Sequence, residues 1–393
     1  MGATALRRSL GMHIMKDIIR EAVARAELEQ RAASPRFDPR AAARETTIHN
    51  TRDNDLEKVL ASLTTKIKVF GCGGAGSNTI QRCTEEDLGD IELVALNTDA
   101  QHLLVTRSPN KILIGRHLTK GLGAGALPQI GEEAALETEQ DLRSQVTGAD
   151  IVFVTCGLGG GTGTGSAPVV ARLAREAGAL TIAVCSLPFD YEGAVRMENA
   201  EAGLARLRDV CDTVIVVPNQ KLLEVAPRLK LVEAFKVADS ILMRSIKGIT
   251  EIVTKPGLVN RDFADLKTIM KRGGVAMIGL GEADGEDRAR NAVLEALNSP
   301  LLDVDISDAT GALVNVVGGR DMTMQEVMRV VEEIHNRVNK DARILWGANI
   351  DENLDHTIRV MLVITGVKSR QILGPTAQKQ ARQKKDMGLD FVL

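Results

Sequence analysis

The residues of clearest chemical meaning form a glycine-rich loop, Gly157–Ser166, which contains Thr162 and Thr164. It follows an apolar run at 150–156 with the pattern of a buried strand, and it precedes a helical pattern at 167–176. Glycine leaves backbone N–H groups bare, a helix N-terminus adds partial positive charge, and hydroxyl groups can bond phosphate oxygens. The loop therefore predicts a phosphate site, because a flexible linker would not lie between a buried strand and a helix.

Two more glycine-rich loops follow strand patterns. Gly71–Asn78 has GxGxxG spacing after the strand at 66–70, and Asp99 lies near the place where a dinucleotide site has an acid for the ribose. Gly115–Ala126 follows the strand at 111–114. A nicotinamide dinucleotide needs one such loop, for its pyrophosphate. Three loops at successive strand ends favour a triphosphate held from several sides, although these residues alone leave a dehydrogenase open.

Polar residues outside the loops have a plain structural interpretation beside a functional one. Glu192 and Arg196 lie four residues apart at a helix start, where a surface ion pair is a common and weak feature. Asn219 ends a strand pattern and suits either a contact to a base or sugar, or a turn. The sequence pattern leaves both interpretations open for each of these residues.

A further polar group, Asn260, Asp262 and Asp265, surrounds the start of a short helical pattern at 266–271. One acid is enough to cap a helix. A loop that holds an amide and two carboxylates could also polarise a water molecule or hold a cation. Capping and chemistry both remain open for this group.

Composition narrows the class of protein. The 393 residues carry a net charge of −3 and only 2% aromatic side chains, so neither a basic surface nor a base-stacking platform for nucleic acid is indicated. The five cysteines form no CxxC, which argues against a disulfide framework and a zinc site and favours a reducing cytoplasm. With no apolar run of eighteen residues and no signal-peptide core, we expect no membrane span.

The elements that position these residues indicate an α/β fold with two units. Strand and helix patterns alternate over residues 64–228, as in a Rossmann-like parallel sheet. The pattern at 229–256 predicts a long helix buried between two bodies. Residues 257–373 predict a smaller α+β unit with a four-stranded sheet and helices on one face. Residues 1–63 predict an extension with a helix and a linker, and residues 374–393 a polar tail that ends in an apolar docking peptide.

Eight motifs in order make the chain resemble the FtsZ family of the tubulin/FtsZ superfamily over about residues 64–370: GCGGAGSN, NTDAQ, GLGAG, GGGTGTG, PFDYEG, PNQ, FKVAD and NRDFAD. The stretches GLVNRDFAD and GEDRA look like FtsZ and not like tubulin proper, and the extension and tail resemble archaeal members. The resemblance implies a tubulin-like fold with a GTP-binding domain at 64–228, a central helix at 229–256 and a GTPase-activating domain at 257–373.

The resemblance also implies a role for each site residue. Two loops would hold the phosphates, a third would sense the γ-phosphate, an ion pair would bind the ribose side, and two polar side chains would read the guanine. An Asp suits guanine because it accepts from N1–H and the amino group, a donor pair that adenine lacks. In that order the residues are Gly74, Ala75, Gly76, Ser77 and Asn78 with Gly160, Gly161, Thr162 and Gly163; Ala124 and Gly125; Glu192 and Arg196; and Asn219 and Asp239, with Asn97 added to the nucleotide-binding set.

The family's activity is that of a cell-division GTPase, so the resemblance implies GTP and GDP as ligands, with Mg²⁺ and a monovalent cation such as K⁺. Subunits would stack head to tail, and Asn260, Asp262 and Asp265 of one subunit would polarise the water at the neighbour's γ-phosphate. Such an interface does not close and builds filaments, here of a cytoplasmic ring at mid-cell. The tail would bind a membrane-anchor protein similar to SepF. The alternatives are a regulatory or scaffold tubulin homologue and, less favoured, a Rossmann NAD(P) oxidoreductase.

Overall fold

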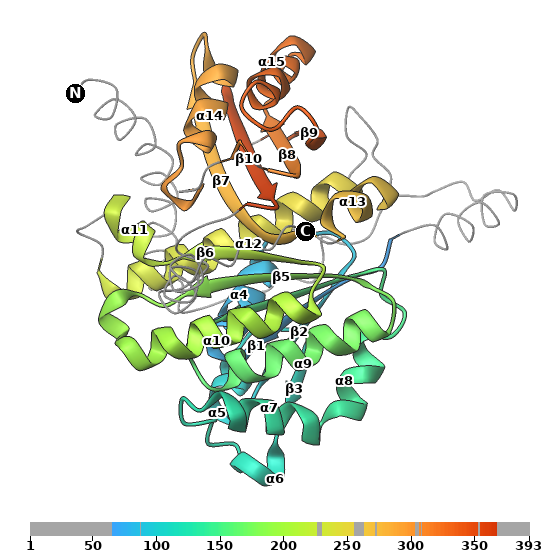
Figure 1. Cartoon of the computed structure of the whole chain (residues 1–393), viewed down its shortest axis with the longest axis vertical. Coiled ribbons are helices and arrows are strands. Elements are labelled where there is room, and N and C mark those ends of the chain that lie inside the picture. The colour runs from blue at the N-terminus through green and yellow to red at the C-terminus, as the bar shows by residue number, and fades with distance from the viewer. Residues whose placement is uncertain are drawn as a thin grey trace, which may run out of the picture.

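Figure 1 shows the computed structural model of the chain, with a larger lower part, a smaller upper part and the long helix α12 (Leu231–Thr254) between them. The predictions for Asn260 and Asp262, for the N-terminal extension and for the tail lie outside the described residues. The structure describes residues 65–86, 88–225, 230–254, 263–271, 273–302, 306–307, 309–352 and 354–367.

The strands of the described residues belong to one hydrogen-bonded sheet, in the order β3-β2-β1-β4-β5-β6-β7-β10-β8-β9. β1 to β6 are parallel, as the alternation of strands and helices predicts. β10 pairs antiparallel with both β7 and β8. The strands are β1 Ile67–Cys72, β2 Ile91–Asn97, β3 Asn110–Leu113, β4 Ile151–Gly157, β5 Leu180–Leu187, β6 Thr213–Pro218, β7 Gly274–Asp284, β8 Gly311–Gly318, β9 Arg343–Ile350 and β10 Thr357–Thr365.

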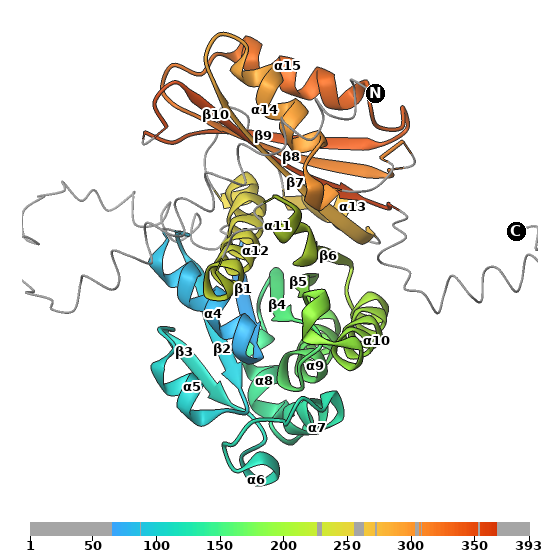
Figure 2. The same cartoon turned by 90° about the vertical axis from the view of Figure 1, so that its left-hand side faces the viewer.

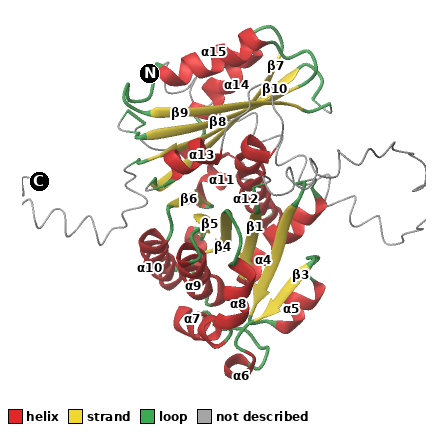
Figure 3. Cartoon of the chain, turned by 90° about the vertical axis from the view of Figure 1, so that its right-hand side faces the viewer, coloured by secondary structure: helices red, strands yellow, loops and turns green. Residues whose placement is uncertain are grey.

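Helices cover both faces of the parallel part (Figures 2 and 3). α7, α8, α9 and α10 bury apolar side chains against one face, and α4, α5, α11 and α12 against the other. The central strands are therefore apolar along nearly their whole length, as parallel strands buried on both faces are. The helices and the 3₁₀ turn of this part are α4 Gly73–Glu85, α5 Ala100–Val105, α6 Arg116–Thr119, α7 Pro128–Glu137, α8 Glu139–Val146, α9 Thr162–Glu176, η1 Asp190–Glu192, α10 Ala194–Val210 and α11 Gln220–Val225.

The second part contains the predicted four strands, β7, β10, β8 and β9, but they continue the first sheet. β7 pairs in parallel with β6, with Thr213 opposite Gly274 and Val216 opposite Met277. The prediction of helices on one face is wrong. α14 (Arg288–Leu297) and α15 (Met324–His335) pack on one face, and α12 and α13 (Phe263–Met270) on the other, because β8 and β10 carry apolar side chains on both faces. A 3₁₀ turn, η2 (Pro300–Leu302), precedes β8.

Helix boundaries depart from the prediction at the glycine loops. α9 begins at Thr162 inside its loop, and α4 begins at Gly73. Glycine has a low helix propensity, but close packing of the loops holds these glycines in a helix. Residues 127–146 have one continuous helical pattern in the sequence but form two helices that meet at Thr138. The short helices α5, α6 and α11 have no predicted counterpart. Within the described ranges, no helix is long and apolar enough to cross a membrane.

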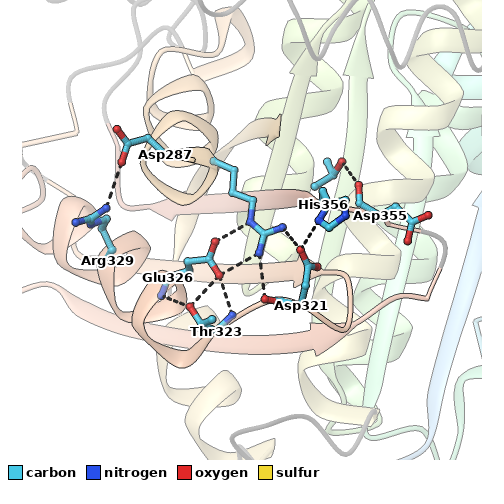
Figure 4. A network of polar contacts seen from close by, with 9 residues as sticks. Asp287, Asp321, Thr323, Glu326, Arg329, Asp355 and His356 are labelled. Carbon is cyan, nitrogen blue, oxygen red and sulfur yellow. Dashed lines mark hydrogen bonds and ion pairs between the residues drawn. The ribbon is translucent and has the colours of Figure 1, made fainter. Parts of the chain in front are cut away.

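A polar network fixes the outer end of the second part (Figure 4). The buried guanidinium of Arg288 donates to Asp321 Oδ2 and to Glu326 Oε1, each at 2.6 Å. Asp321 also lies 2.9 Å from His356 Nδ1. Glu326 accepts the backbone N–H and the hydroxyl of Thr323, at 2.8 and 2.9 Å, in the capping box of α15. The network therefore ties α14 to the segments that precede α15 and β10.

Candidate functional site

The predicted loops meet at one edge of the sheet. β1, β4, β5 and β6 are parallel, so the segments that follow them all leave from their carboxyl ends. The strand order reverses between β1 and β4, because β2 and β3 extend the sheet to one side and β4 to β6 to the other. Ligands of open α/β sheets bind in the crevice at such a switch point. The Gly71 loop (Gly71–Asn78) and the Gly157 loop (Gly157–Ser166) flank this point.

Two helix N-termini converge there. α4 begins at Gly73 and α9 at Thr162, and neither has a side chain that caps its first N–H groups. A Cβ atom added at Gly73 would lie 2.7 Å from the backbone nitrogen of Gly163, so the two helix starts are in contact. Uncapped N–H groups and the positive ends of two helix dipoles make this a site for an anion such as phosphate.

The glycines of these loops fall into two classes. At Gly76, Gly161 and Gly163, an added Cβ would come within 2.6, 2.9 and 2.9 Å of neighbouring atoms, so packing requires glycine. At Gly74 and Gly160, no atom lies within 4 Å of that position, and neither residue has the positive φ that favours glycine. Packing and backbone conformation do not account for these two residues. A ligand that approaches the bare backbone does.

The Gly115 loop (Gly115–Ala126) closes on the Gly157 loop. An added Cβ at Gly161 would lie 2.9 Å from the Cβ of Ala124, which is buried. Gly125, the next residue, has a φ of +57° and open space around it. On the other side, an added Cβ at Gly157 would lie 2.8 Å from the Cβ of Ala75. The three loops predicted to surround the phosphates are thus brought together.

A hydroxyl pair links two of the predicted segments. Thr98 Oγ1 lies 2.6 Å from Thr162 Oγ1 and joins the end of β2 to the start of α9. The sequence prediction missed Thr98, although it stands in the NTDAQ motif next to Asn97. The buried side chain of Asn97 accepts the N–H of Asp99 at 3.3 Å and lies 3.3 Å from His102 Nδ1. Asn97 therefore holds the turn that presents Thr98.

Asp99, the residue that supports a dehydrogenase, has a structural role. Its Oδ1 accepts the N–H groups of Gln101 and His102 at 2.9 and 3.0 Å, which makes it the N-cap of α5. The acid of a nicotinamide site instead bonds the ribose hydroxyls. The position of Asp99 is thus accounted for by the fold.

Two predicted residues are buried acceptors. Asn219 follows β6, and its Oδ1 has no hydrogen-bond partner in the described part of the chain. Asp239 lies on α12, where burial raises the pKa of its carboxyl to about 7, although the charge of Arg82 and a hydrogen bond from Asn78 lower it. Both fit a ligand that donates hydrogen bonds, because an unpaired buried acceptor such as Asn219 Oδ1 is costly and the carboxylate of Asp239 can accept more than one bond.

An aromatic residue that the sequence prediction missed lies beside Asp239. Phe235 is one helical turn before it on α12 and is 38% exposed. Its ring packs edge-on against Phe189, with centroids 5.3 Å apart, and Phe189 stacks on Tyr191 at 5.1 Å. A partly exposed ring that packs on a buried one offers a surface for a planar base. Phe235 stands in the FKVAD motif, in which the resemblance assigns a role to Asp239 alone.

Ser77, in α4, is fully buried, and its Oγ has no partner among the residues described. Two of the three unpartnered buried side-chain atoms in that part of the chain, Ser77 Oγ and Asn219 Oδ1, therefore belong to predicted nucleotide-binding residues. The third is Thr155 Oγ1, in β4. Buried polar atoms are nearly always paired, so these positions fit a polar ligand or an ordered water molecule.

The predicted pair of Glu192 and Arg196 is formed. Arg196 Nε lies 2.9 Å from Glu192 Oε2, and Glu192 Oε1 accepts the N–H of Phe189 at 2.8 Å. The Glu192 side chain is only 10% exposed and that of Arg196 48%. An added Cβ at Gly159 would lie 2.6 Å from the carbonyl oxygen of Arg196, so the pair is held against the Gly157 loop.

Asp265 lies at the opposite end of the parallel strands. It is exposed in the first turn of α13. The last residue of that helix, Met270, accepts the hydroxyl of Thr213 at 2.5 Å, and Thr213 is the first residue of β6. Asn219, by contrast, follows the carboxyl end of the same strand. The structure therefore separates Asp265 from the loops of its own chain.

Metal ligands are not assigned by this arrangement. In the described ranges, no group of three or more His, Cys, Asp or Glu is placed to hold a metal ion.

Comparison with known proteins gives first the class and then the family. The family model described as "Tubulin/FtsZ family, GTPase domain" matches residues 66–227, so the parallel sheet with its loops is a tubulin-like GTPase domain that binds GTP and GDP. The model "FtsZ family, C-terminal domain" matches residues 274–368. The chain belongs to the FtsZ family.

Relatives match over nearly the whole chain. "Cell division protein FtsZ 1" of Archaeoglobus fulgidus is 57% identical, over 96% of this chain and 99% of its own. "Cell division protein FtsZ 1" of Halobacterium salinarum is 56% identical, over 92% and 91%. The solved structure "FtsZ dimer, empty" from M. jannaschii is 54% identical and has a TM-score of 0.77, with 81% of this chain and 93% of that chain covered. The predicted resemblance to archaeal FtsZ is confirmed.

Proposed function

We propose that the chain is a cell-division GTPase that polymerises head to tail and hydrolyses GTP at the interface between subunits. The observation that carries the proposal is the position of Asp265 at the amino ends of the parallel strands, whereas the glycine loops lie at the carboxyl ends. Stacking one subunit on the next places the acids of one over the loops of the other. An interface of this kind does not close, so it generates filaments.

In this proposal the nucleotide spans the crevice. Its phosphates lie on the backbone of two loops, at 74–78 and 160–163, with Ala124 and Gly125 near the γ-phosphate. The pair of Glu192 and Arg196 lies on the ribose side. The guanine is bound by two further polar residues and one aromatic ring: Asn219, Asp239 and Phe235.

Hydrolysis then needs groups from two subunits. Asn260, Asp262 and Asp265 of the neighbour polarise the attacking water and help to organise a cation. Mg²⁺ is the expected divalent ion, because it binds nucleotide phosphates together with one or two carboxylates. K⁺ is the candidate monovalent ion. Neither subunit owns a complete site, so turnover depends on assembly.

The remaining parts are assigned by the same proposal. The GTP-binding domain comprises 64–228, the central helix 229–256 and the GTPase-activating domain 257–373. The extension at 1–63 precedes them. The tail at 374–393 binds a membrane-anchor protein of the SepF kind through its terminal peptide, and the filaments form a cytoplasmic ring at mid-cell.

The test measures GTP hydrolysis per subunit across protein concentration, together with pelleting of polymer in GTP and in GDP. We expect the rate per subunit to rise with concentration. We expect Asp265→Ala to keep GTP affinity, to lower turnover by about a hundredfold or more, and to give longer-lived polymer. Asp141→Ala, which removes another exposed acid from a first helical turn, is the matched control. A rate per subunit that is flat with concentration, or loss of GTP binding in Asp265→Ala, would overturn the shared site.

A further inference from the structure

One turn of α12 packs on a single row of the second part of the sheet. Met361 of β10, Asn315 of β8 and Gly347 of β9 are paired directly across the strands. An added Cβ at Gly248 of α12 would clash with the thioether of Met361, and one at Gly347 would lie 3.2 Å from Ile252. Positions 248 and 252 are one turn apart. The backbone of α12 therefore lies close on this row.

Three buried polar side chains, called the polar set below, lie between those two contacts. Glu251 Oε2 accepts Nδ2 of Asn315 at 3.3 Å. Oδ1 of Asn315 accepts Nδ2 of Asn349, on β9, at 3.4 Å. All three side chains are buried. Directed hydrogen bonds thus join α12 to both β8 and β9.

The surroundings of the polar set are apolar. Ile249 and Ile252 of α12 and Leu313 and Leu345 of the sheet belong to one hydrophobic cluster. Apolar side chains of similar shape could fill these positions and would leave no buried polar group without a partner. Stability of the fold therefore does not require the polar set. A directed bond has one geometry, whereas apolar contacts tolerate sliding. Buried polar groups of this kind can select a single arrangement.

The same strands hold the element that follows. α12 ends three residues after Glu251, and α13, which carries Asp265, also packs on β8 and β9. An added Cβ at Gly311 of β8 would lie 3.0 Å from Ile269 of α13. Asn260 and Asp262 therefore lie in sequence between two helices, α12 and α13, that both pack on β8 and β9.

We propose that Glu251, Asn315 and Asn349 are positioning residues for GTP hydrolysis. Their hydrogen bonds fix the end of α12 on the sheet and so set where the acids that follow reach the neighbouring nucleotide. The inference rests on the proposed hydrolysis between subunits. Asp239 lies twelve residues before Glu251, about 18 Å away along the helix. Loss of the hydrogen bonds of the polar set therefore lowers GTP turnover and leaves nucleotide affinity near normal.

The experiment compares Glu251→Leu, which has no acceptor, with Glu251→Gln, which keeps an acceptor oxygen and the shape. Ser245→Ala is the matched control, because Ser245 is buried on the same helix and its hydroxyl donates to the Ile241 carbonyl of that helix, at 2.6 Å. The measurements are the affinity for a fluorescent GTP analogue, the polymer mass by pelleting, and GTP turnover per polymerised subunit.

Glu251→Leu is expected to lower turnover per polymerised subunit by about tenfold or more, as small displacements of catalytic groups do, with GTP affinity changed by less than about threefold. Glu251→Gln should recover most of the turnover, and Ser245→Ala should match the unaltered protein. Unchanged turnover per polymerised subunit in Glu251→Leu would overturn the proposal, and so would an equal loss in Ser245→Ala.

A second variant decides the question if Glu251→Leu does not fold. Asn349→Ala removes only the distal link and should lower turnover by about threefold at unchanged GTP affinity. Unchanged turnover in that variant would overturn the proposal as well. The failure of the proposed function is separate: it would appear in the unaltered protein, as a rate per subunit that does not depend on concentration.

Discussion

The side-chain amide of Asn78, on α4, donates a hydrogen bond to the carboxylate of Asp239, on α12. The resemblance to FtsZ assigns Asn78 to the phosphates and Asp239 to the guanine. The contact joins the two groups, because α4 begins in the phosphate loop and reaches the base side within its first two turns. The ionisation of Asp239 is therefore coupled to a helix that begins in the predicted phosphate loop.

The affinity for GTP should fall as the pH is lowered through about 7. Burial raises the pKa of Asp239 to about 7, and only the ionised carboxylate can accept from both guanine donors. Below that pH, affinity should drop by up to about tenfold per pH unit, the limit for one linked proton. Titration of a fluorescent GTP analogue between about pH 6 and pH 8 measures this. Asp239→Asn should bind more weakly and with a flat profile.

The same shift has the opposite sign for the stability of the nucleotide-free protein. The pKa of Asp239 is raised above its ordinary value of 3.8, so its contribution to the free energy of unfolding is full below that value and is lost as the pH rises towards about 7. The free energy of unfolding of the nucleotide-free protein, measured with denaturant across this pH range and compared with that of Asp239→Asn, isolates the contribution of Asp239. For the binding prediction, a GTP affinity that does not change between about pH 6 and pH 8 in the unaltered protein would contradict the link between binding and the ionisation of Asp239.

Gly160→Ala and Gly165→Ala should fail in different ways. An added Cβ at Gly160 meets no atom within 4 Å, so the variant should fold with an unchanged melting temperature. It should lose about tenfold or more in GTP affinity, because the methyl group occupies space next to the phosphates. At Gly165 the added atom would clash with the carbonyl oxygen of Pro128, so that variant should lose stability first.

Thermal melts without nucleotide and GTP titrations on both variants separate the two effects. A Gly160→Ala protein with normal GTP affinity would remove the argument that this glycine exists for a ligand.

The sequence predicted the parallel sheet well because its strands are buried on both faces. β4 and β5 appear as largely apolar runs of seven and eight residues, interrupted only by Thr155, Thr181 and Ser186, and runs of that length favour a strand buried on both faces over a helix. The phosphate loops were equally visible, because glycines cluster there for reasons that no helix or strand shares. The resemblance to FtsZ added roles for Asn219 and Asp239 that neither residue type alone could provide.

The sequence could not predict contacts that depend on packing between distant segments. Thr98 gives no signal until the fold places its hydroxyl against Thr162. Asp99 satisfied a spacing rule for dinucleotide sites, but the cap of α5 decides its role, and α5 is too short to give a clear pattern. Phe235 gives the same helical signal as a core residue, and only its exposure reveals the difference.

Arg288→Met should destabilise the second part without weakening GTP binding. The buried guanidinium is bonded to both Asp321 and Glu326, and the substitution leaves two carboxylates without their cation. We expect the melting temperature at neutral pH to fall by several degrees. Arg320→Met is the control, because Arg320 forms an ion pair with Glu352 in which both side chains are mostly exposed, and such pairs contribute little.

The acid limb of the stability profile provides the decisive measurement for this network. Hydrogen bonds from Arg288 lower the pKa of Asp321 and that of Glu326 below their ordinary values of 3.8 and 4.5. Their contribution to the free energy of unfolding is therefore present above those values and is lost as the pH falls through the lowered ones. The difference between the unaltered protein and Arg288→Met should shrink as the pH is lowered below about 4. A constant difference down to acid pH, or an equal loss in Arg320→Met, would show that the network does not act through these ion pairs.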